Sequence, residues 1–229
     1  MFSKGIERGF APFKNSLPSP LMKGRGTKGE GLVNSIEQVR SFIAIELPGD
    51  LKEGLAQLQA QLKLSKPPSV KWVDPYSVHL TLKFLGNIAV GRIPEVTQAI
   101  KEATRGLSPF HLEVKGLGVF PNLRRVQVVW VGISGEVDRL GQLQHRIESN
   151  LVPLGFTAES RPFTPHLTLA RLRDRALPDE RERFGQLIAS TKFETVYAIK
   201  VDSINLMRSQ LTREGAIYSR LSSVELRGG

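Results

Sequence analysis

Apolar residues recur along the body of the chain with periods of about two and about 3.6 residues, which predict strands and helices. A nearly unbroken apolar run at 41–47 indicates a buried strand, which the Pro48-Gly49 pair ends. Leucines at helical spacing then predict an amphipathic helix over 50–64, with Asp50 placed to cap it. Further helices are expected at 93–105, 134–151 and 178–190, and strands at 71–73, 78–85, 110–118, 125–132, 165–172, 193–206 and 215–225. Hairpins mixed with helices in this order predict an α+β fold.

Residues 1–38 follow neither period. Glycine and proline are frequent in this stretch, apolar residues are sparse, and no apolar core of a signal peptide follows the early basic residues. We therefore expect residues 1–38 to form a disordered N-terminal extension, with no catalytic role, and residues 39–229 to form the folded domain.

Composition narrows the class of protein. The chain has no cysteine, which excludes disulfides, thiolate metal sites and a cysteine nucleophile, and is typical of the reducing cytoplasm. No apolar run approaches the roughly 18 residues of a membrane-spanning helix. The net charge is +10, and the part after residue 40 is itself basic, with 25 Lys and Arg against 19 Asp and Glu. A basic body favours a polyanionic partner such as nucleic acid, although a basic surface without a partner explains the same charge.

One phrase occurs twice. His-Leu-Thr-Leu stands at 79–82 and again at 166–169, so two of the four histidines share the same local sequence. Because side chains alternate along a strand, His79 and Thr81 lie on one face, and His166 and Thr168 do the same in the second copy. The leucines then anchor each strand in a core. A single such strand would most simply carry a structural histidine, but two copies favour a shared site.

Such a site would hold two imidazoles and two hydroxyls. Two imidazoles that titrate near neutral pH can serve as general acid and general base, and hydroxyls can bind the non-bridging oxygens of a phosphate. This combination suits cleavage of a phosphodiester without a metal, and the spacing alone does not say which histidine is the acid.

Other chemistries fit less well. A catalytic zinc site usually needs three protein ligands, and no carboxylate lies inside either phrase, since a turn separates Asp74 from His79. No Gly-x-Ser-x-Gly elbow or phosphate-binding P-loop is present. The other two histidines, His111 and His145, are interpreted as surface or structural residues.

The motifs resemble those of the two-histidine phosphoesterase superfamily, and within it the RNA 2′,3′-cyclic phosphodiesterases once called 2′-5′ RNA ligases. The resemblance covers about 40–225. It is carried by SFIAIELP at 41–48, VKWVDPYSVHLTLKFLG at 70–86, GLGVFPN at 116–122, RPFTPHLTLAR at 161–171 and GAIYSRL at 215–221. Family members usually begin near position 40, so the first 38 residues are an addition to the pattern.

The resemblance implies a bilobal fold of two antiparallel-sheet lobes, with helices on the outside and a central cleft lined by both His-x-Thr motifs. It implies hydrolysis of a terminal 2′,3′-cyclic phosphate on RNA to a 2′-phosphomonoester, without metal or cofactor. In the family's usual assignment, His79 would be the proton donor to the leaving 3′ oxygen and His166 the proton acceptor from water, while Thr81 and Thr168 would bind the phosphate. The reverse reaction would join RNA ends through a 2′-5′ bond, with the histidine roles exchanged.

Five further residues are candidate substrate contacts. Arg171 follows Thr168 by three positions, so it lies on the opposite strand face unless the strand is irregular, but a guanidinium at a strand end suits a phosphate. Arg124 and Arg125 follow the Phe-Pro-Asn turn and are candidates for the RNA backbone. Phe120 either stacks on a base or belongs to the core, and Tyr218 is a candidate for the cleft.

Three other aromatic residues are assigned to packing. Phe84 shares the parity of Leu80 and Leu82, which places it in the core, and Trp72 and Trp130 are interpreted as packing residues.

Two alternatives to the leading hypothesis remain open: an RNA-binding module without turnover, and a phosphodiesterase for 2′-5′ linked or small cyclic nucleotides. We expect a cytoplasmic monomer whose partner is RNA with a cyclic phosphate end, and no membrane association.

Overall fold

The computed structural model describes residues 37–67, 69–193, 196–213 and 215–228. The expected extension at 1–38 lies outside these residues, except that Gln38 already begins the first strand. The strands are β1 Gln38–Glu46, β2 Val70–Trp72, β3 His79–Ala89, β4 Phe110–Phe120, β5 Val128–Gly135, β6 His166–Leu172, β7 Tyr197–Val201, β8 Ser203–Leu211 and β9 Ala216–Glu225. The helices are α1 Gly49–Lys63, α2 Ile93–Thr104, α3 Val137–Leu151 and α4 Pro178–Ser190, with short 3-10 turns at Pro75–Ser77, Val90–Arg92 and Val152–Leu154.

The strands form two antiparallel sheets, as the α+β expectation requires. One sheet has the order β3-β1-β8-β9 and the other β2-β6-β5-β4-β7. Each sheet therefore mixes strands from both halves of the sequence, and the two lobes are not two consecutive halves of the chain. The two His-Leu-Thr-Leu strands, β3 and β6, belong to different sheets.

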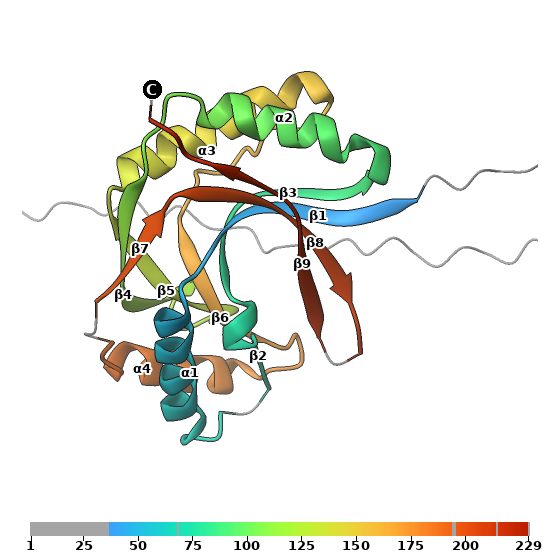
Figure 1. Ribbon diagram of the computed structural model, residues 1–229. Helices are drawn as coiled ribbons and strands as arrows, with labels where there is room; N and C mark the ends of the chain where they lie inside the picture. Colours follow the sequence, from blue (N-terminus) through green and yellow to red (C-terminus); the bar gives the residue numbers. More distant parts are fainter. Residues whose placement is uncertain (1–36, 68, 194–195, 214, 229) are drawn as a thin grey trace, which may run out of the picture. The chain divides into compact units, whose positions relative to one another are not determined.

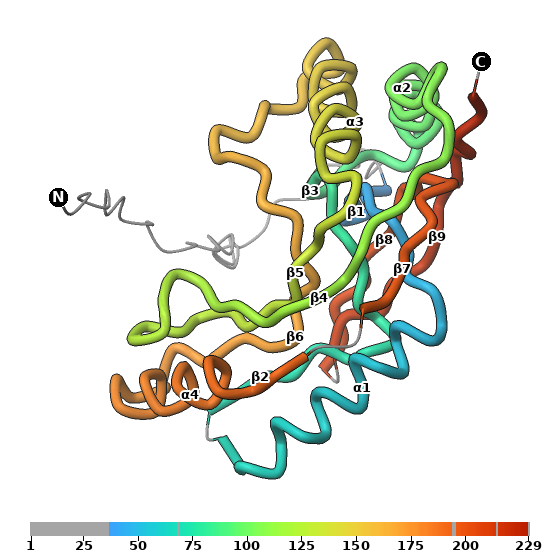
Figure 2. The backbone as a smooth tube through the Cα atoms, turned by 90° about the vertical axis from the view of Figure 1, so that its left-hand side faces the viewer, coloured from blue at the N-terminus to red at the C-terminus, as the bar shows by residue number. Residues whose placement is uncertain are grey.

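Two helices cover each sheet on its outer side. Figure 1 shows α2 and α3 above the four-stranded sheet and α1 and α4 below the five-stranded one, and the same separation is visible in Figure 2. The helix α1 follows β1 along the chain but packs on the other sheet. Its buried Gln59 shows this contact, since the side chain donates to the carbonyl of Leu169 in β6 (3.1 Å). Because the helices lie on the outer sides, one face of each sheet is free of helices. The histidine and threonine side chains of both motifs lie on these faces.

The apolar stripes of the helices are confirmed as core. Their members at helical spacing are buried in α1 (Leu51, Leu55, Leu58, Leu62), in α2 (Val96, Ile100) and in α3 (Leu140, Leu143, Ile147). The expected cap of α1 was wrong: the helix begins at Gly49 after Pro48, and Asp50 lies in its first turn, where its carboxylate accepts from the neighbouring Leu51 amide (2.8 Å).

The strand expected at 193–206 is really two strands in different sheets. The strand β7 pairs with β4 in one sheet and β8 pairs with β1 in the other, with Asp202 between them. The chain crosses from sheet to sheet at this residue, and the Asp202 carbonyl accepts from the Leu226 amide (2.8 Å). The apolar pattern runs through both strands because each has a buried side, so the sequence gives no sign of the crossing.

Candidate active site

Both motif histidines are held in the same way. The Nδ1 atom of His79 lies 2.9 Å from the carbonyl oxygen of Ser77, and Nδ1 of His166 lies 2.7 Å from that of Thr164. A carbonyl can only accept, so Nδ1 carries the proton in each ring and Nε2 is left to exchange a proton with another molecule. In each case the acceptor is two residues before the histidine, so the turn that leads into the strand orients the ring.

The strand β6 carries a bulge inside its motif. Its register against β5 pairs Trp130 with Thr168 and Val129 with Ala170, which leaves Leu169 as an extra residue. The alternation shifts by one position there: Leu169 and Ala170 are both buried, and Arg171 returns to the face of His166 and Thr168. Regular alternation would have placed Arg171 on the opposite face, and the bulge is the reason that it does not lie there.

The first motif has the same bulge. In β3, Ala44 pairs with Thr81 and Ile43 with Lys83, so Leu82 is the extra residue. Phe84 consequently shares the face of His79 and is 68% exposed, and the core position expected for it was wrong. Phe84 occupies the position in the first motif that Arg171 occupies in the second, five residues after the histidine.

Aromatic rings surround His79. The Phe42 ring stacks on it at 4.5 Å between centroids, and Tyr218 meets it edge-on at 4.9 Å. Phe42 and Tyr218 also contact each other, at 5.2 Å, and form a small apolar cluster with Ala44 and Met207. The sequence indicated Tyr218 as a candidate, whereas Phe42 appeared only as part of a buried strand.

His166 has an equivalent surround. Phe120 meets it edge-on at 5.1 Å, and Trp130 lies 6.4 Å away. The Trp130 indole covers Gly118, where an added Cβ would come within 2.2 Å of the ring. Trp130 therefore packs, as expected, but it packs beside the candidate site. Trp72 packs edge-on against Phe184, away from both histidines.

Burial is the main influence on both imidazoles. Desolvation lowers the pKa of His79 and of His166 below the ordinary value of 6.5. At His79 the hydrogen bond to Ser77 and then the carboxylate of Glu46 act against this lowering of the pKa, while the charge of Lys52 adds to it. At His166 the hydrogen bond to Thr164 acts against the lowering, and the positive charge of Arg171 adds to it. The two rings thus differ in that only His79 has a carboxylate among the charges that influence it.

Arg171 links the two sheets electrostatically. Its side chain is open to solvent on one side, but desolvation by its surroundings lowers the pKa of the guanidinium, and the Tyr218 hydroxyl acts against this effect. Burial raises the pKa of Tyr218, and Arg171 opposes that rise. Since Tyr218 lies in β9 against His79, and Arg171 lies in β6 near His166, this pair brings the two motifs into one site.

Glu46 was not identified from the sequence. It pairs with His79 across β1 and β3, accepts from Asn205 Nδ2 (2.9 Å) and forms an ion pair with Arg220. A single carboxylate that ends a buried apolar strand was the available signal. The Thr81 and Thr168 hydroxyls, by contrast, have no hydrogen-bond partner among the described residues.

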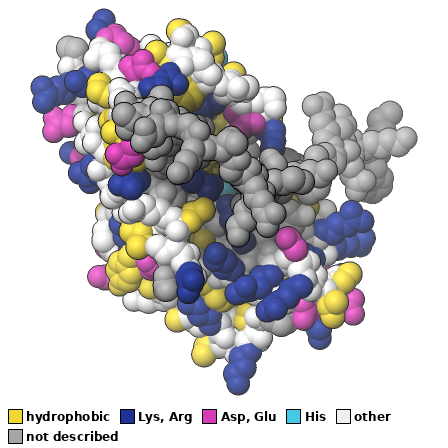
Figure 3. Space-filling model, turned by 90° about the vertical axis from the view of Figure 1, so that its right-hand side faces the viewer, with side chains coloured by type: hydrophobic (Ala, Val, Ile, Leu, Met, Phe, Trp, Pro, Cys, Tyr) yellow, Lys and Arg dark blue, Asp and Glu magenta, His cyan; other side chains and the backbone are white. Residues whose placement is uncertain are grey.

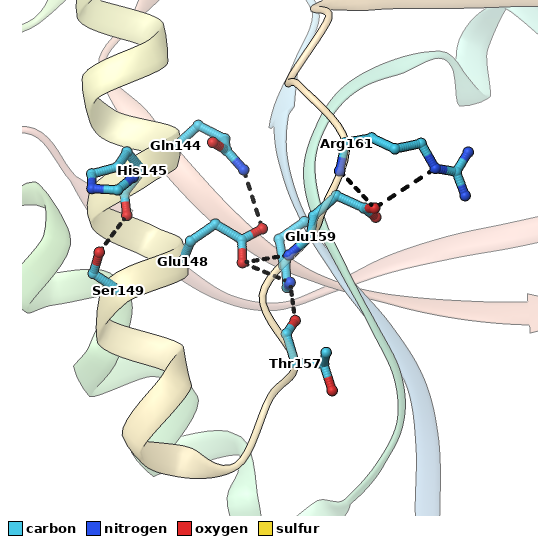
Figure 4. A network of polar contacts seen from close by, with 8 residues as sticks. Gln144, His145, Glu148, Ser149, Thr157, Glu159 and Arg161 are labelled. Carbon is cyan, nitrogen blue, oxygen red and sulfur yellow. Dashed lines mark hydrogen bonds and ion pairs between the residues drawn. The ribbon is translucent and has the colours of Figure 1, made fainter. Parts of the chain in front are cut away.

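A buried ion pair ties the first motif to the segment before the second. Lys83 Nζ donates to Glu148 Oε2 in α3 (2.7 Å) and to the Thr157 carbonyl (2.6 Å). Figure 4 shows Glu148 between Gln144 and the segment that contains Thr157 and Glu159. The backbone amide of Glu159 also donates to the Glu148 carboxylate (3.4 Å). Residues 157–159 lead toward Thr164, which orients His166, so the contact connects both halves of the candidate site.

The remaining predicted residues lie outside this group. Arg124 and Arg125 are exposed in the turn between β4 and β5, where their amides donate to Asn122 Oδ1, and no contact places either beside a motif histidine. His111 and His145 are at the surface, as expected.

The described residues hold neither a metal-ligand cluster nor a membrane-spanning helix. No three side chains among His, Cys, Asp and Glu gather in an arrangement suited to a metal ion. No helix in the described ranges has the length and apolar character needed to span a membrane.

Comparison with known proteins agrees with this geometry. The family model described as LigT-like phosphoesterase matches twice, at residues 45–130 and 131–218, once for each histidine motif. A protein of Methanothermobacter thermautotrophicus named RNA 2′,3′-cyclic phosphodiesterase is 33% identical over 82% of this chain and all of its own length. One of Aeropyrum pernix with the same name is 34% identical over 75% of this chain and 94% of its own.

Solved structures give the same result. The crystal structure of E. coli LigT complexed with 3′-AMP has a TM-score of 0.67 at 25% identity, and covers 83% of this chain and 99% of its own. The double match of the family model spans well over half of the sequence, and the chain belongs to the LigT-like phosphoesterase family.

Proposed function

We propose that the protein is a hydrolase that opens the terminal 2′,3′-cyclic phosphate of RNA to a 2′-phosphomonoester, with His79 and His166 as its acid and base. The relatives that match over most of the chain carry the name RNA 2′,3′-cyclic phosphodiesterase. The paired His-x-Thr strands and their common orientation support the same reaction here.

The reaction needs two proton transfers and one displacement. Nε2 of neutral His166 accepts a proton from water as the water oxygen attacks phosphorus. The bond between phosphorus and the 3′ oxygen breaks, and Nε2 of protonated His79 gives its proton to that oxygen. The products are a free 3′-hydroxyl and a 2′-phosphomonoester, and solvent exchange resets the two rings. General acid and base catalysis each contribute about 10²–10⁴-fold in such steps.

The charges beside the rings carry this assignment of roles. Glu46 stabilises a protonated His79 more than Lys52 disfavours it, which suits the donor, and Arg171 disfavours a protonated His166, which suits the acceptor. The opposite assignment would place a cation beside Arg171 and a neutral base beside a carboxylate.

Three groups on the same faces suit the phosphate. The hydroxyls of Thr81 and Thr168 stand beside the histidines without partners in the described part of the chain. The bulge brings Arg171 to the same face, where its guanidinium can hold two phosphate oxygens at once. Phe120, Tyr218 and the exposed Phe84 present aromatic rings to the attached nucleoside.

The site as proposed is complete in one chain. Both imidazoles and the phosphate-binding groups come from β3 and β6, so a monomer suffices, and acid–base catalysis by two histidines requires no metal. When the 5′-hydroxyl of a second RNA replaces water, the same attack forms a 2′-5′ bond, so ligation in this direction keeps the roles of the two histidines, and the exchange of roles expected from the resemblance applies to the cleavage of that bond.

The test is a digest of a short RNA that ends in a 2′,3′-cyclic phosphate, in excess EDTA, followed by phosphorus NMR of the product. We expect a 2′-phosphomonoester. A 3′-phosphomonoester would keep the acid–base pair but reverse the leaving group, and a loss of activity in EDTA would contradict metal independence.

Variants separate catalysis from binding. His79→Ala should abolish turnover and leave RNA affinity within a few-fold, while His145→Ala, at the exposed surface of α3, should change neither. If RNA affinity falls as far as turnover does, His79 is a binding group. Tight RNA binding without any product from the wild-type protein would favour a binding module.

A further inference from the structure

A hollow of about 420 Å³ adjoins the candidate site on the β6 side. It is lined by Lys71, Arg171, Leu172, Arg173, Asp174 and Arg175, so four cations face one carboxylate. Arg171 belongs both to the hollow and to the face of His166. Lys71 pairs with Arg171 across β2 and β6, so the two side chains lie next to each other in the hollow. Side chains of Lys and Arg gather on the lower half of the face drawn in Figure 3.

None of the four cations forms an ion pair with a carboxylate in the described part of the chain. Some arginines elsewhere on the surface are paired, as Arg105 is with Glu102 (2.8 Å) and Arg139 with Glu136 (2.9 Å), whereas Arg124 and Arg125, like the cations of the hollow, have no ion pair among the described residues. The hollow therefore holds positive charge that the protein does not neutralise, beside a site expected to take a phosphate.

The segment that carries Arg173 and Arg175 is fixed by its backbone. The guanidinium of Arg181 donates to the carbonyls of Val126 (2.7 Å), Arg173 (3.0 Å), Ala176 (3.2 Å) and Asp174 (3.4 Å). The Arg173 amide also donates to the Ser69 carbonyl (2.8 Å). A segment held in this way loses little further freedom when its side chains bind a ligand.

We propose that Lys71, Arg173 and Arg175 form a shelf for the backbone phosphates of the RNA nucleotides on the 5′ side of the cyclic end. The inference rests on the proposed function and extends it to the choice of substrate. A 2′,3′-cyclic phosphate is by its chemistry the 3′ end of a strand, so the rest of the RNA continues from the site in one direction. The hollow begins at Arg171, next to the reacting phosphate, and its cations suit the phosphates that follow.

The shelf makes the enzyme prefer RNA strands to mononucleotides. Contacts to phosphates carry no sequence information, so the preference is for length and not for particular bases. A nucleoside 2′,3′-cyclic phosphate fills only the reaction site and does not reach the shelf. Substitutions in the shelf should therefore act on one class of substrate and spare the other.

The test is a triple variant with Lys71→Gln, Arg173→Gln and Arg175→Gln. Its matched control is Lys101→Gln, Arg105→Gln and Arg227→Gln, which removes the same charge at and near α2. For a ten-nucleotide RNA with a cyclic phosphate end, the shelf variant should lose about 10-fold or more in kcat/KM, mainly through KM. For cytidine 2′,3′-cyclic phosphate, the kcat/KM of the shelf variant should stay within 2-fold of wild type, because this substrate has no further phosphates for the shelf to contact.

Salt gives a second readout. Each phosphate contact to a single strand contributes about 0.7 to the slope of log affinity against log salt, so the loss of three contacts should flatten the slope by about 2. The control variant should keep the wild-type preference for the longer substrate.

Each contrary result is decisive. Unchanged kinetics on RNA, an equal loss on both substrates, or an equal loss in the control variant would overturn the shelf. If the wild-type protein hydrolyses neither substrate, the proposed function fails. The shelf is then judged by the fluorescence anisotropy of a labelled RNA with a 2′-phosphate end, which the shelf variant must bind more weakly than the control does.

Discussion

The side-chain amide of Gln59 in α1 donates to the carbonyl of Leu169 (3.1 Å), the residue that forms the bulge in β6. Gln59 is only 1% exposed and also donates to the Val73 carbonyl (2.7 Å). The helix below the sheet thus holds the irregularity that turns Arg171 toward His166. The position of a cation in the candidate site therefore depends on a buried amide in another element.

Gln59→Leu should destabilise the protein by about 1–3 kcal/mol, because the buried carbonyl of Leu169 and the partly buried carbonyl of Val73 each lose a donor. It should also reduce kcat/KM more than Gln57→Leu does, a control substitution at an exposed position of the same helix. Urea unfolding and steady-state kinetics measure the two effects. If the two variants have the same kinetics, the bulge holds Arg171 without help from α1.

The buried ion pair of Lys83 and Glu148 gives a second prediction. Their side chains are 8% and 12% exposed, so Glu148→Gln leaves a buried ammonium without its counter-charge and should cost about 3 kcal/mol. Glu102→Gln, in an exposed pair with Arg105, should cost less than about 1 kcal/mol. Urea unfolding compares them, and similar costs would show that the buried pair adds nothing special. Lys83→Met combined with Glu148→Leu should regain part of the lost stability.

The acidity of the two histidines predicts the pH dependence of the reaction. Desolvation lowers both pKa values below 6.5, so in free enzyme His166 stays a base at moderately acidic pH and His79 loses its proton below the usual range. The profile of kcat/KM should be bell-shaped with its maximum below pH 6.5. A bound phosphate raises the pKa of His79, so the alkaline limb of kcat should lie at higher pH. A flat profile between pH 5 and 8 would contradict the pair.

Stability should depend on pH through the same groups. At pH values well above 6.5 the imidazoles are neutral in both folded and unfolded chains and contribute nothing to the difference. As the pH falls below 6.5, the unfolded chain takes up protons that the folded rings resist, so the free energy of unfolding decreases until the lowered pKa values are passed. Denaturant unfolding between pH 7.5 and 5.5 measures this loss, and a variant with His79→Gln and His166→Gln should lose less.

Phe84 and Leu82 provide a matched pair on one strand. Phe84→Ala should change stability by only about 0.5 kcal/mol, because its ring is 68% exposed. Leu82→Ala, at a position 3% exposed, should cost about 2–5 kcal/mol. Thermal unfolding distinguishes them, and a large loss from Phe84→Ala would mean that its ring belongs to the core after all.

Local periodicity was enough for much of the fold. The apolar stripes of α1, α2 and α3 and the strands that carry the two motifs lie where the sequence predicts them, because the periods of a helix and of a strand depend on neighbouring residues alone. The same alternation correctly placed His79 beside Thr81 and His166 beside Thr168, and the repeated motif was sufficient to indicate the family.

Only the tertiary structure decided what depends on pairing between strands. A bulge is a mismatch between two partners, so neither Leu82 nor Leu169 is marked in its own strand, and the faces of Phe84 and Arg171 could not be derived from parity. The division of 193–206 between two sheets has the same origin. Glu46 reaches His79 through the pairing of β1 with β3, a contact between segments that the sequence separates. The sequence by itself determined which residues share a strand face, and the fold decided which faces meet.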